Sequence, residues 1–248
     1  MRVTKHHGLG NDFLVLLDPA GAAGAGPDLA RALCDRHTGV GADGLLLGTR
    51  GDDTADLGMT LWNADGSVAE MSGNGIRCLV QAALAAGLVD GPVVEVATMA
   101  GLRRVEVKPG PDDRTIEATV DMGEARVVRS TARQAEVDVG NPHLVVLDPD
   151  GLADLAELGP AHPDVNVEVI RPALDGAVDL RVWERGVGPT EACGTGAVAA
   201  AVAAHRWGLV GDRVVVRMPG GAAEVGLGDT ATLTGPATFV AAVEVPWP

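Results

Sequence analysis

The sequence contains no tyrosine, only two phenylalanines and four tryptophans, and few positive charges. Its 19 Lys and Arg residues stand against 34 Asp and Glu residues, so the formal net charge of the 248-residue chain is −15. A shortage of rings for base stacking and an excess of negative charge both argue against nucleic-acid binding, and the charge also argues against an anionic membrane surface. Hydrophobic residues still make up 46% of the chain, so we expect a packed core of Val, Leu, Ile and Ala.

The sequence also lacks the long apolar runs and cysteine motifs of other protein classes. No run approaches the roughly 20 residues of a membrane span, and the residues after Met1 do not form a signal peptide, so we expect a cytoplasmic protein. The cysteines number three and form no CxxC pair or disulfide framework. Neither HExxH nor paired CxxC spacing is present, so no metal is expected. No lysine lies in the motifs described below, so no pyridoxal phosphate is expected either; the predicted cofactor content is none.

Short β-branched runs alternate with turns and a few helical stretches, which predicts an α/β fold. Strands are expected at 2–6, 13–17, 57–62, 93–97, 102–107, 115–120, 136–139, 144–147, 165–170, 178–183, 213–218, 222–225 and 239–245. Helices are expected at 27–36, 75–86 and 196–206. Gly44 and the small-residue loop 20–26 are interpreted as plain connections.

An internal repeat divides the chain into two related halves. Trp62 and Trp183 lie 121 positions apart, and the same offset places Ser72 on Cys193 and Gly75 on Gly196. A strand, a polar turn, a Ser/Cys-Gly-x-Gly segment and a helix thus recur in one order. The turn at 109–114 is the expected boundary, with one half at 1–113 and the other at 114–235.

The segments 72–75 and 193–196 each begin a predicted helix with two glycines. Glycine allows close approach of a ligand to the backbone, and the free N–H groups of a helix start favour an anion. Neither segment is a Walker A or a dinucleotide-binding motif. If both helices point into one crevice, their amide groups can hold one carboxylate from two sides.

Cys193 is the predicted catalytic residue because it stands at one of these helix starts. The helix dipole favours a thiolate there, so the pKa of Cys193 is expected to be lowered. A thiolate can then act as a general base on the α-proton of a bound amino acid. Cys34 and Cys78 lie inside helical patterns with apolar neighbours and are interpreted as buried structural residues.

A series of segments resembles the diaminopimelate epimerase family over nearly the whole length. The segments are Gly8-Leu9-Gly10-Asn11-Asp12-Phe13, Gly39-Val40-Gly41-Ala42-Asp43-Gly44, Asn63-Ala64-Asp65-Gly66-Ser67, Met71-Ser72-Gly73-Asn74-Gly75-Ile76-Arg77-Cys78, Gly140-Asn141-Pro142-His143, Asn166-Val167, Glu184-Arg185-Gly186 and Ala192-Cys193-Gly194-Thr195-Gly196. Single segments are modestly specific, whereas all of them in this order are strongly specific.

The resemblance implies a cofactor-independent homodimeric epimerase that interconverts LL- and meso-diaminopimelate in lysine and peptidoglycan precursor synthesis. Two pseudo-symmetric domains are implied, each a curved, mostly antiparallel sheet around a central helix, with the active site in the cleft between them. The segment 236–248, which contains the final strand at 239–245, is expected to return to the first half. The implied substrate-binding residues are Asn11, Asn63, Gly73, Asn74, Asn141, Asn166, Glu184, Arg185, Gly194 and Thr195. Of these, Asn141, Asn166, Glu184 and Arg185 are expected to grip the distal ammonium and carboxylate. The amides around Gly73-Asn74 and Gly194-Thr195 are expected to hold the reacting carboxylate, and His143 either supports the site or ends a turn.

Two positions depart from the family pattern. The family has a second catalytic cysteine where this chain has Ser72, and a serine hydroxyl needs an adjacent base that the sequence does not supply. Pro189 stands where the family usually has Glu, which puts only the loop before Cys193 in doubt.

The departure at Ser72 leaves three interpretations open. The chain can be an epimerase that carries serine in place of the catalytic cysteine and is disabled or slowed by it. It can be a single-thiol relative that acts on another amino acid as a racemase or dehydratase. It can also be a non-catalytic amino-acid-binding protein, although the retained Cys193 argues against that.

Overall fold

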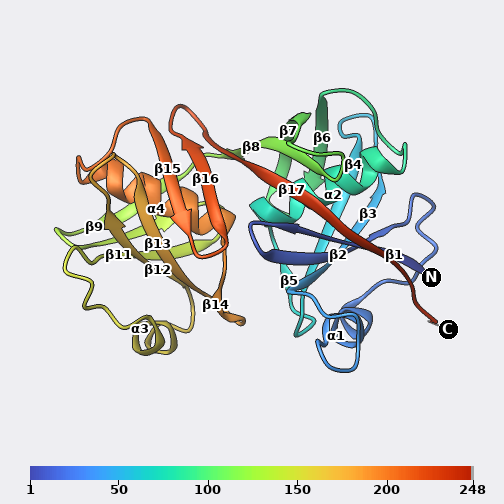
Figure 1. The fold of residues 1–248 in the computed structure, drawn as a ribbon, viewed down its shortest axis with the longest axis horizontal. Coiled ribbons are helices and arrows are strands. Elements are labelled where there is room, and N and C mark those ends of the chain that lie inside the picture. The colour runs from blue at the N-terminus through green and yellow to red at the C-terminus, as the bar shows by residue number, and fades with distance from the viewer. Residues whose placement is uncertain (247–248) are drawn as a thin grey trace. The chain divides into compact units, whose positions relative to one another are not determined.

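The contacts within the chain divide it into two compact units. The computed structural model describes residues 1–246 (Figure 1). Unit 1 consists of Met1–Val120 with the chain from Pro236 onward, and unit 2 of Asp121–Gly235. The chain leaves unit 1 within strand β8 (Thr115–Gly123) and returns within β17 (Ala231–Glu244). The first crossing between the units therefore falls inside β8. This point lies after the turn at 109–114, where the sequence places the boundary.

Unit 1 is a curved sheet that closes on itself. Its strands run in the order β17, β1, β2, β3, β4, β6, β7 and β8, and β8 pairs with β17 again. The pairs β2–β3 and β4–β6 are parallel and the others with a stated register are antiparallel. Its elements are β1 (Arg2–Gly8), β2 (Asn11–Leu17), α1 (Pro27–Cys34), β3 (Gly44–Arg50), β4 (Leu57–Asn63), β5 (Val68–Ala69), α2 (Gly73–Ala85), β6 (Val93–Thr98) and β7 (Gly101–Pro109).

Unit 2 repeats this order of elements. Its parallel pairs β11–β12 and β13–β15 correspond to β2–β3 and β4–β6, and the short hairpin strand β14 corresponds to β5. The helices α3 and α4 follow β11 and β14 as α1 and α2 follow β2 and β5. Its elements are β9 (Arg126–Ser130), β10 (Gln134–Asp138), β11 (Pro142–Leu147), α3 (Leu155–Ala161), β12 (Asn166–Pro172), β13 (Val178–Glu184), β14 (Gly188–Thr190), α4 (Gly194–Arg206), β15 (Arg213–Met218) and β16 (Gly221–Gly226). The common order confirms the pseudo-symmetry that the sequence repeat predicts.

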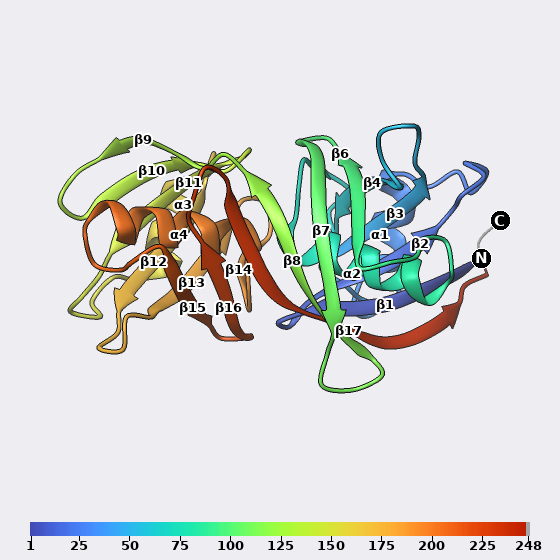
Figure 2. The same cartoon turned by 90° about the horizontal axis from the view of Figure 1, so that it is seen from above.

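In each unit the curved sheet wraps around one long helix, α2 or α4 (Figures 1 and 2). Nearly every residue of these two helices is buried, because a helix surrounded by strands has no solvent-facing side. Both helices are followed by a glycine with positive φ, 66° at Gly87 and 72° at Gly208, which ends a helix without a Cβ penalty. Each helix starts two residues earlier than the apolar pattern predicts, so Gly73 and Gly194 are its first residues.

The structure corrects the interpretation of Gly44 as a connection. Gly44 begins β3, a strand that the sequence analysis missed because its Leu45-Leu46-Leu47 run shows no alternation. A Cβ at Gly44 would lie 2.8 Å from the carbonyl oxygen of Trp62, so the close pairing of β3 with β4 requires glycine. Strand β9 and helix α3 were also missed. No helix within residues 1–246 has the length and apolar character needed to cross a membrane.

Candidate active site

In unit 1 the predicted polar residues gather where three neighbouring strands begin or end. Asn11 opens β2, Gly44 opens β3 and Asn63 closes β4, and Gly44 pairs directly with Asn63. Asn63 donates a hydrogen bond from Nδ2 to the Ser67 hydroxyl at 2.9 Å, across the hairpin that leads to β5. The parallel and antiparallel pairing of these strands thus brings residues from distant positions to one end of the sheet.

A chain of side-chain hydrogen bonds fixes the orientation of two asparagine amides in unit 1. Asp43 accepts from Nδ2 of Asn11 at 2.8 Å, and Oδ1 of Asn11 accepts from Nδ2 of Asn74 at 3.1 Å. Oδ1 of Asn74 in turn accepts from Nη2 of Arg77 at 2.6 Å. A carboxylate only accepts and a guanidinium only donates, so neither amide can flip without losing its partners. Asp43 and Arg77 therefore fix the orientation of the Asn11 and Asn74 amide groups.

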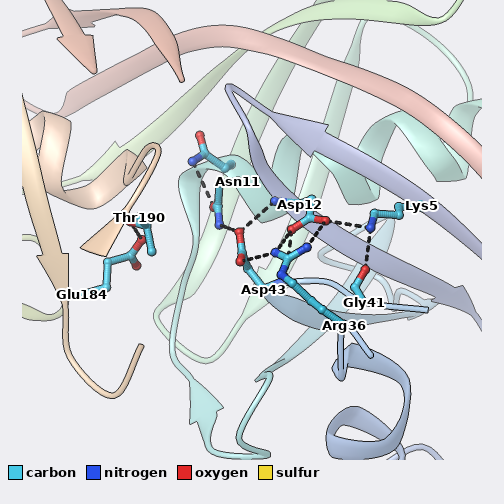
Figure 3. Close-up of polar contacts among 9 residues, drawn as sticks. Lys5, Asn11, Asp12, Arg36, Gly41, Asp43, Glu184 and Thr190 are labelled. Carbon is cyan, nitrogen blue, oxygen red and sulfur yellow. Dashed lines mark hydrogen bonds and ion pairs between the residues drawn. The ribbon is translucent and has the colours of Figure 1, made fainter. Parts of the chain in front are cut away.

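A cluster of charged residues holds Asp43 in place (Figure 3). Arg36 contacts Asp43 at 2.8 Å and Asp12 at 2.7 Å, and Lys5 contacts Asp12 at 2.8 Å. Lys5 also donates to the Gly41 carbonyl at 2.5 Å. Burial acts to raise the pKa of Asp12, but the hydrogen bonds from Arg36 and Lys5 outweigh it and hold that pKa below its usual value.

Arg77 is a fully buried cation in the helix that starts at Gly73. Its Nε donates to the Pro236 carbonyl at 3.3 Å, whereas its Nη1 has no hydrogen-bond partner within residues 1–246. Burial lowers the pKa of Arg77 to about 10. The positive charge thus lies against the side-chain oxygen of Asn74, near the start of α2.

Ser72 is the N-cap residue of α2. Its hydroxyl oxygen accepts from the Gly75 amide at 3.0 Å, as serine does at many helix starts. Within residues 1–246 no acidic or imidazole side chain hydrogen-bonds to this hydroxyl. The structure therefore gives Ser72 a capping role and no base of its own.

Unit 2 places its predicted residues at the corresponding end of its sheet. Asn166 opens β12 and Glu184 closes β13, beside each other in the antiparallel pair. Oδ1 of Asn166 accepts from the backbone amide of Arg185 at 2.8 Å, and Glu184 accepts from the Thr190 hydroxyl at 2.6 Å (Figure 3). The strand β14 forms despite Pro189, which lies opposite Trp183 in that pairing.

Cys193 caps helix α4 as Ser72 caps α2. Its sulfur accepts from the Gly196 amide at 3.4 Å and lies 3.5 Å from the Thr195 hydroxyl. Nδ2 of Asn141 donates to the same hydroxyl at 3.5 Å. Asn141 therefore contacts the helix start that carries Cys193. The resemblance implied only that Asn141 binds the distal end of a substrate.

The expectation of a lowered pKa at Cys193 is wrong. Burial, together with the negative charge of Glu184, raises the pKa of Cys193 well above its usual value, against the opposing hydrogen bonds from Thr195 and Gly196. The helix dipole alone does not offset the loss of water and a nearby carboxylate. Cys193 is therefore a thiol. Burial also raises the pKa of Cys34 and of Cys78 to about 12, and both side chains are buried as predicted.

Sequence analysis missed a buried pair beside this helix start, His143 with Glu168. The sequence left two roles open for His143, support of the site or the end of a turn. In the structure His143 is buried, with Nδ1 2.7 Å from Glu168 and Nε2 2.9 Å from Oδ1 of Asn141. The sequence feature that could have revealed this pair is the single Glu in the apolar run Val167–Ile170. A carboxylate in a buried strand nearly always has a partner, so this Glu predicts one. Residues 1–246 contain no group of three His, Cys, Asp or Glu side chains arranged to hold a metal ion.

Comparison with known proteins decides the family. The sequence model of the family described as diaminopimelate epimerase matches residues 3–128 and 136–240. The chain belongs to the diaminopimelate epimerase family. It is 43% identical to the diaminopimelate epimerase of Desulforudis audaxviator, over 89% of each chain. It is 42% identical to that of Thermobifida fusca, over 99% of this chain and 98% of the relative.

Solved structures show how widely the fold of this diaminopimelate epimerase family member is shared. A hydroxyproline epimerase from Agrobacterium vitis superposes with a TM-score of 0.75 at 20% identity, covering 98% of this chain and 91% of that chain. A predicted epimerase from Pseudomonas aeruginosa superposes with a TM-score of 0.77 at 16% identity, covering 100% and 99%. Both likenesses confirm the two-domain α/β fold.

Proposed function

We propose that this chain transfers the α-proton of diaminopimelate, in the reaction that interconverts the LL and meso isomers, with Cys193 as an acid–base group. The observation that carries the proposal is the environment of Cys193, a buried thiol at the start of α4 that contacts Thr195 and the Gly196 amide. Membership of the diaminopimelate epimerase family supplies the reaction class.

Backbone amides at two helix starts are proposed to bind the reacting carboxylate. Gly73 and Asn74 open α2, and Gly194 and Thr195 open α4, so their N–H groups lie at the positive end of each helix dipole. Such groups favour an anion, and they favour it more as charge moves onto the carboxylate when the α-proton leaves.

Four polar side chains of unit 2 and two of unit 1 are proposed to select the substrate. Glu184 and amide oxygens suit an ammonium group, whereas Arg185 and amide N–H groups suit a carboxylate. A site with these groups favours an amino acid that carries both a distal ammonium and a distal carboxylate over one that lacks them. The proposed contacts are Asn11, Asn63, Asn141, Asn166, Glu184 and Arg185.

Glu184 is proposed to link substrate binding to the activation of Cys193. Its negative charge helps to raise the pKa of Cys193. A substrate ammonium that pairs with Glu184 cancels that charge and so lowers the cost of forming the thiolate. The thiolate is then formed chiefly when the substrate is bound.

Ser72 is proposed to leave one of the two acid–base positions of the family without a strong base. A hydroxyl with no partner base does not remove an α-proton at a useful rate. We therefore expect the chain to exchange the α-proton of one isomer through Cys193 and to invert it slowly.

Proton NMR of LL- and meso-diaminopimelate in D₂O tests this function. We expect loss of the α-proton signal of one isomer, with little of the other isomer formed, and no loss with a Cys193→Ser variant. Exchange on another amino acid but not on diaminopimelate would instead favour a single-thiol racemase or dehydratase. Thermal protection by diaminopimelate without any exchange would favour a binding protein. A homodimer and a cytoplasmic location remain predictions.

A further inference from the structure

Glu168 breaks the pseudo-symmetry between the two units at a buried position. In unit 1 the strand pair β2–β3 aligns Val15 with Leu46, and in unit 2 the pair β11–β12 aligns Val145 with Glu168. Leu46 approaches the helix glycine Gly75, while Glu168 approaches the corresponding glycine of α4. Unit 2 thus carries a carboxylate where unit 1 carries a leucine, in a place with no exposure to water.

The buried carboxylate pairs with a buried imidazole. Oε1 of Glu168 lies 2.7 Å from Nδ1 of His143, and both side chains have 0% exposure. Oε2 of Glu168 has no hydrogen-bond partner within residues 1–246. A full negative charge on an unpartnered buried oxygen is costly, so a proton shared with His143 is favoured over a carboxylate beside a neutral ring.

Counting donors and acceptors leads to the same result. Nδ1 of His143 faces Glu168, and Nε2 faces Oδ1 of Asn141 at 2.9 Å. An amide oxygen only accepts, so Nε2 must carry a proton. The contact at Nδ1 then needs a second proton, either on Nδ1 or on Glu168. The pair therefore holds one proton more than a neutral imidazole with a carboxylate.

The amide that His143 orients leads to Cys193. Nδ2 of Asn141 points to the Thr195 hydroxyl at 3.5 Å, and that hydroxyl lies 3.5 Å from the Cys193 sulfur. When the amide donates to Thr195, the hydroxyl proton is left to donate to the sulfur. That arrangement stabilises a thiolate, the form of Cys193 that removes a proton.

We propose that Glu168 is a positioning residue for Cys193. It shares a buried proton with His143, and this proton fixes the amide of Asn141 and, through it, the hydroxyl of Thr195. The catalytic consequence rests on the proposed function, whereas the protonation of His143 does not. The other titratable groups that face this cluster are Cys193 at the start of α4 and Glu184 at the end of β13.

Nitrogen-15 NMR of the histidine rings tests the protonation independently of activity. We expect Nε2 of His143 to carry a proton and Nδ1 to be either protonated or hydrogen-bonded to a protonated Glu168, with both signals assigned from their absence in a His143→Gln variant. An Nδ1 that neither carries nor accepts a proton would overturn the shared proton. An Nε2 without a proton would also overturn the proposal, because Asn141 would then present its Nδ2 to the ring and its oxygen to Thr195.

Kinetics of α-proton exchange tests the positioning role. Glu168→Leu copies the residue of unit 1, and we expect it to lower kcat by about tenfold to a hundredfold with KM little changed, because the groups around Cys193 lose their fixed orientation. Glu168→Gln should keep most of the activity, since its amide can donate to Nδ1 in place of the shared proton. Glu191→Leu is the matched control, because Glu191 is exposed and lies two residues before Cys193.

The two measurements separate the inference from the proposed function. Equal kcat for Glu168→Leu and the unchanged protein would overturn the positioning role even if diaminopimelate exchanges. If no variant exchanges any proton on diaminopimelate, the proposed function fails, and the ring-nitrogen spectrum still decides whether the buried proton exists. If Glu168→Leu does not fold, the nitrogen-15 spectrum of the unchanged protein decides whether Glu168 and His143 share a proton.

Discussion

Replacing Ser72 by cysteine should make the protein a faster enzyme and a less stable one. The change is small in shape, because Cys193 already occupies the corresponding N-cap position of α4. The two caps also make the same contact: the Gly75 amide donates to Ser72 at 3.0 Å and the Gly196 amide donates to Cys193 at 3.4 Å. A thiol at position 72 therefore fits the local backbone without rearrangement.

The stability cost follows from the cap. Serine is among the best N-cap residues, and its replacement by a poor one costs about 0.5–2 kcal/mol. Sulfur is a weak acceptor that keeps part of this contact, so we expect a cost of about 1 kcal/mol. For a chain of this size, that cost corresponds to a fall in Tm of roughly 2–4 °C.

The gain in activity follows from the second acid–base group. A positioned acid or base typically supplies about 10²–10⁴ in rate. Ser72→Cys should therefore raise the rate of interconversion of LL- and meso-diaminopimelate at least about a hundredfold, or about 2.7 kcal/mol in activation free energy.

Inversion is followed by proton NMR in D₂O, and stability by thermal unfolding of both proteins. Ser72→Ala serves as the control, because it removes the hydroxyl without adding a thiol and should match the slow inversion of the unchanged chain. Equal inversion rates for the unchanged chain and the Ser72→Cys variant would refute the assignment of position 72 as an acid–base group. A large rate loss in Ser72→Ala would show instead that the hydroxyl itself moves a proton.

Three further predictions follow from the contacts. Asp43→Asn replaces the charged partner of Asn11, and a hydrogen bond to a charged group contributes about 1.5–3 kcal/mol. We therefore expect KM for diaminopimelate to rise by about tenfold or more in steady-state assays. An unchanged KM would show that Asn11 does not depend on the charge of Asp43. Arg36→Met should lower the free energy of unfolding at pH 7 by roughly 1 kcal/mol or less, because Arg36 is half exposed. The lowered pKa of Asp12 stabilises the fold above its unfolded value near pH 4, so this difference should shrink as the pH falls below that value in urea titrations. All three cysteines should resist iodoacetamide at pH 8 in the folded chain and react after unfolding, because burial raises the pKa of each thiol. Mass spectrometry measures the extent of labelling. Rapid labelling of the folded protein would contradict this prediction.

The local sequence determined the two helix starts and the repeat. Ser72 and Cys193 occupy equivalent N-caps, as the 121-residue offset indicates, because capping and the Gly-x-Gly pattern are local properties of the chain. The family motifs also single out Asn11, Asn166 and Glu184, which the structure places at strand ends. Strand β3 was missed, because an unbroken leucine run has the same appearance in a buried strand and in a buried helix.

Only the tertiary structure decided the protonation of Cys193 at the start of α4. The pairing of β11 with β12 brings Glu168 beside His143, 25 residues away in the chain. The curved sheet removes both from water, and it also buries Cys193 and leaves Glu184 close enough to help raise the pKa of Cys193. Sequence reasoning predicted the opposite shift, because it counted the helix dipole, which is local. Desolvation and charges from other strands depend on which segments the fold brings together, and a motif does not contain that information.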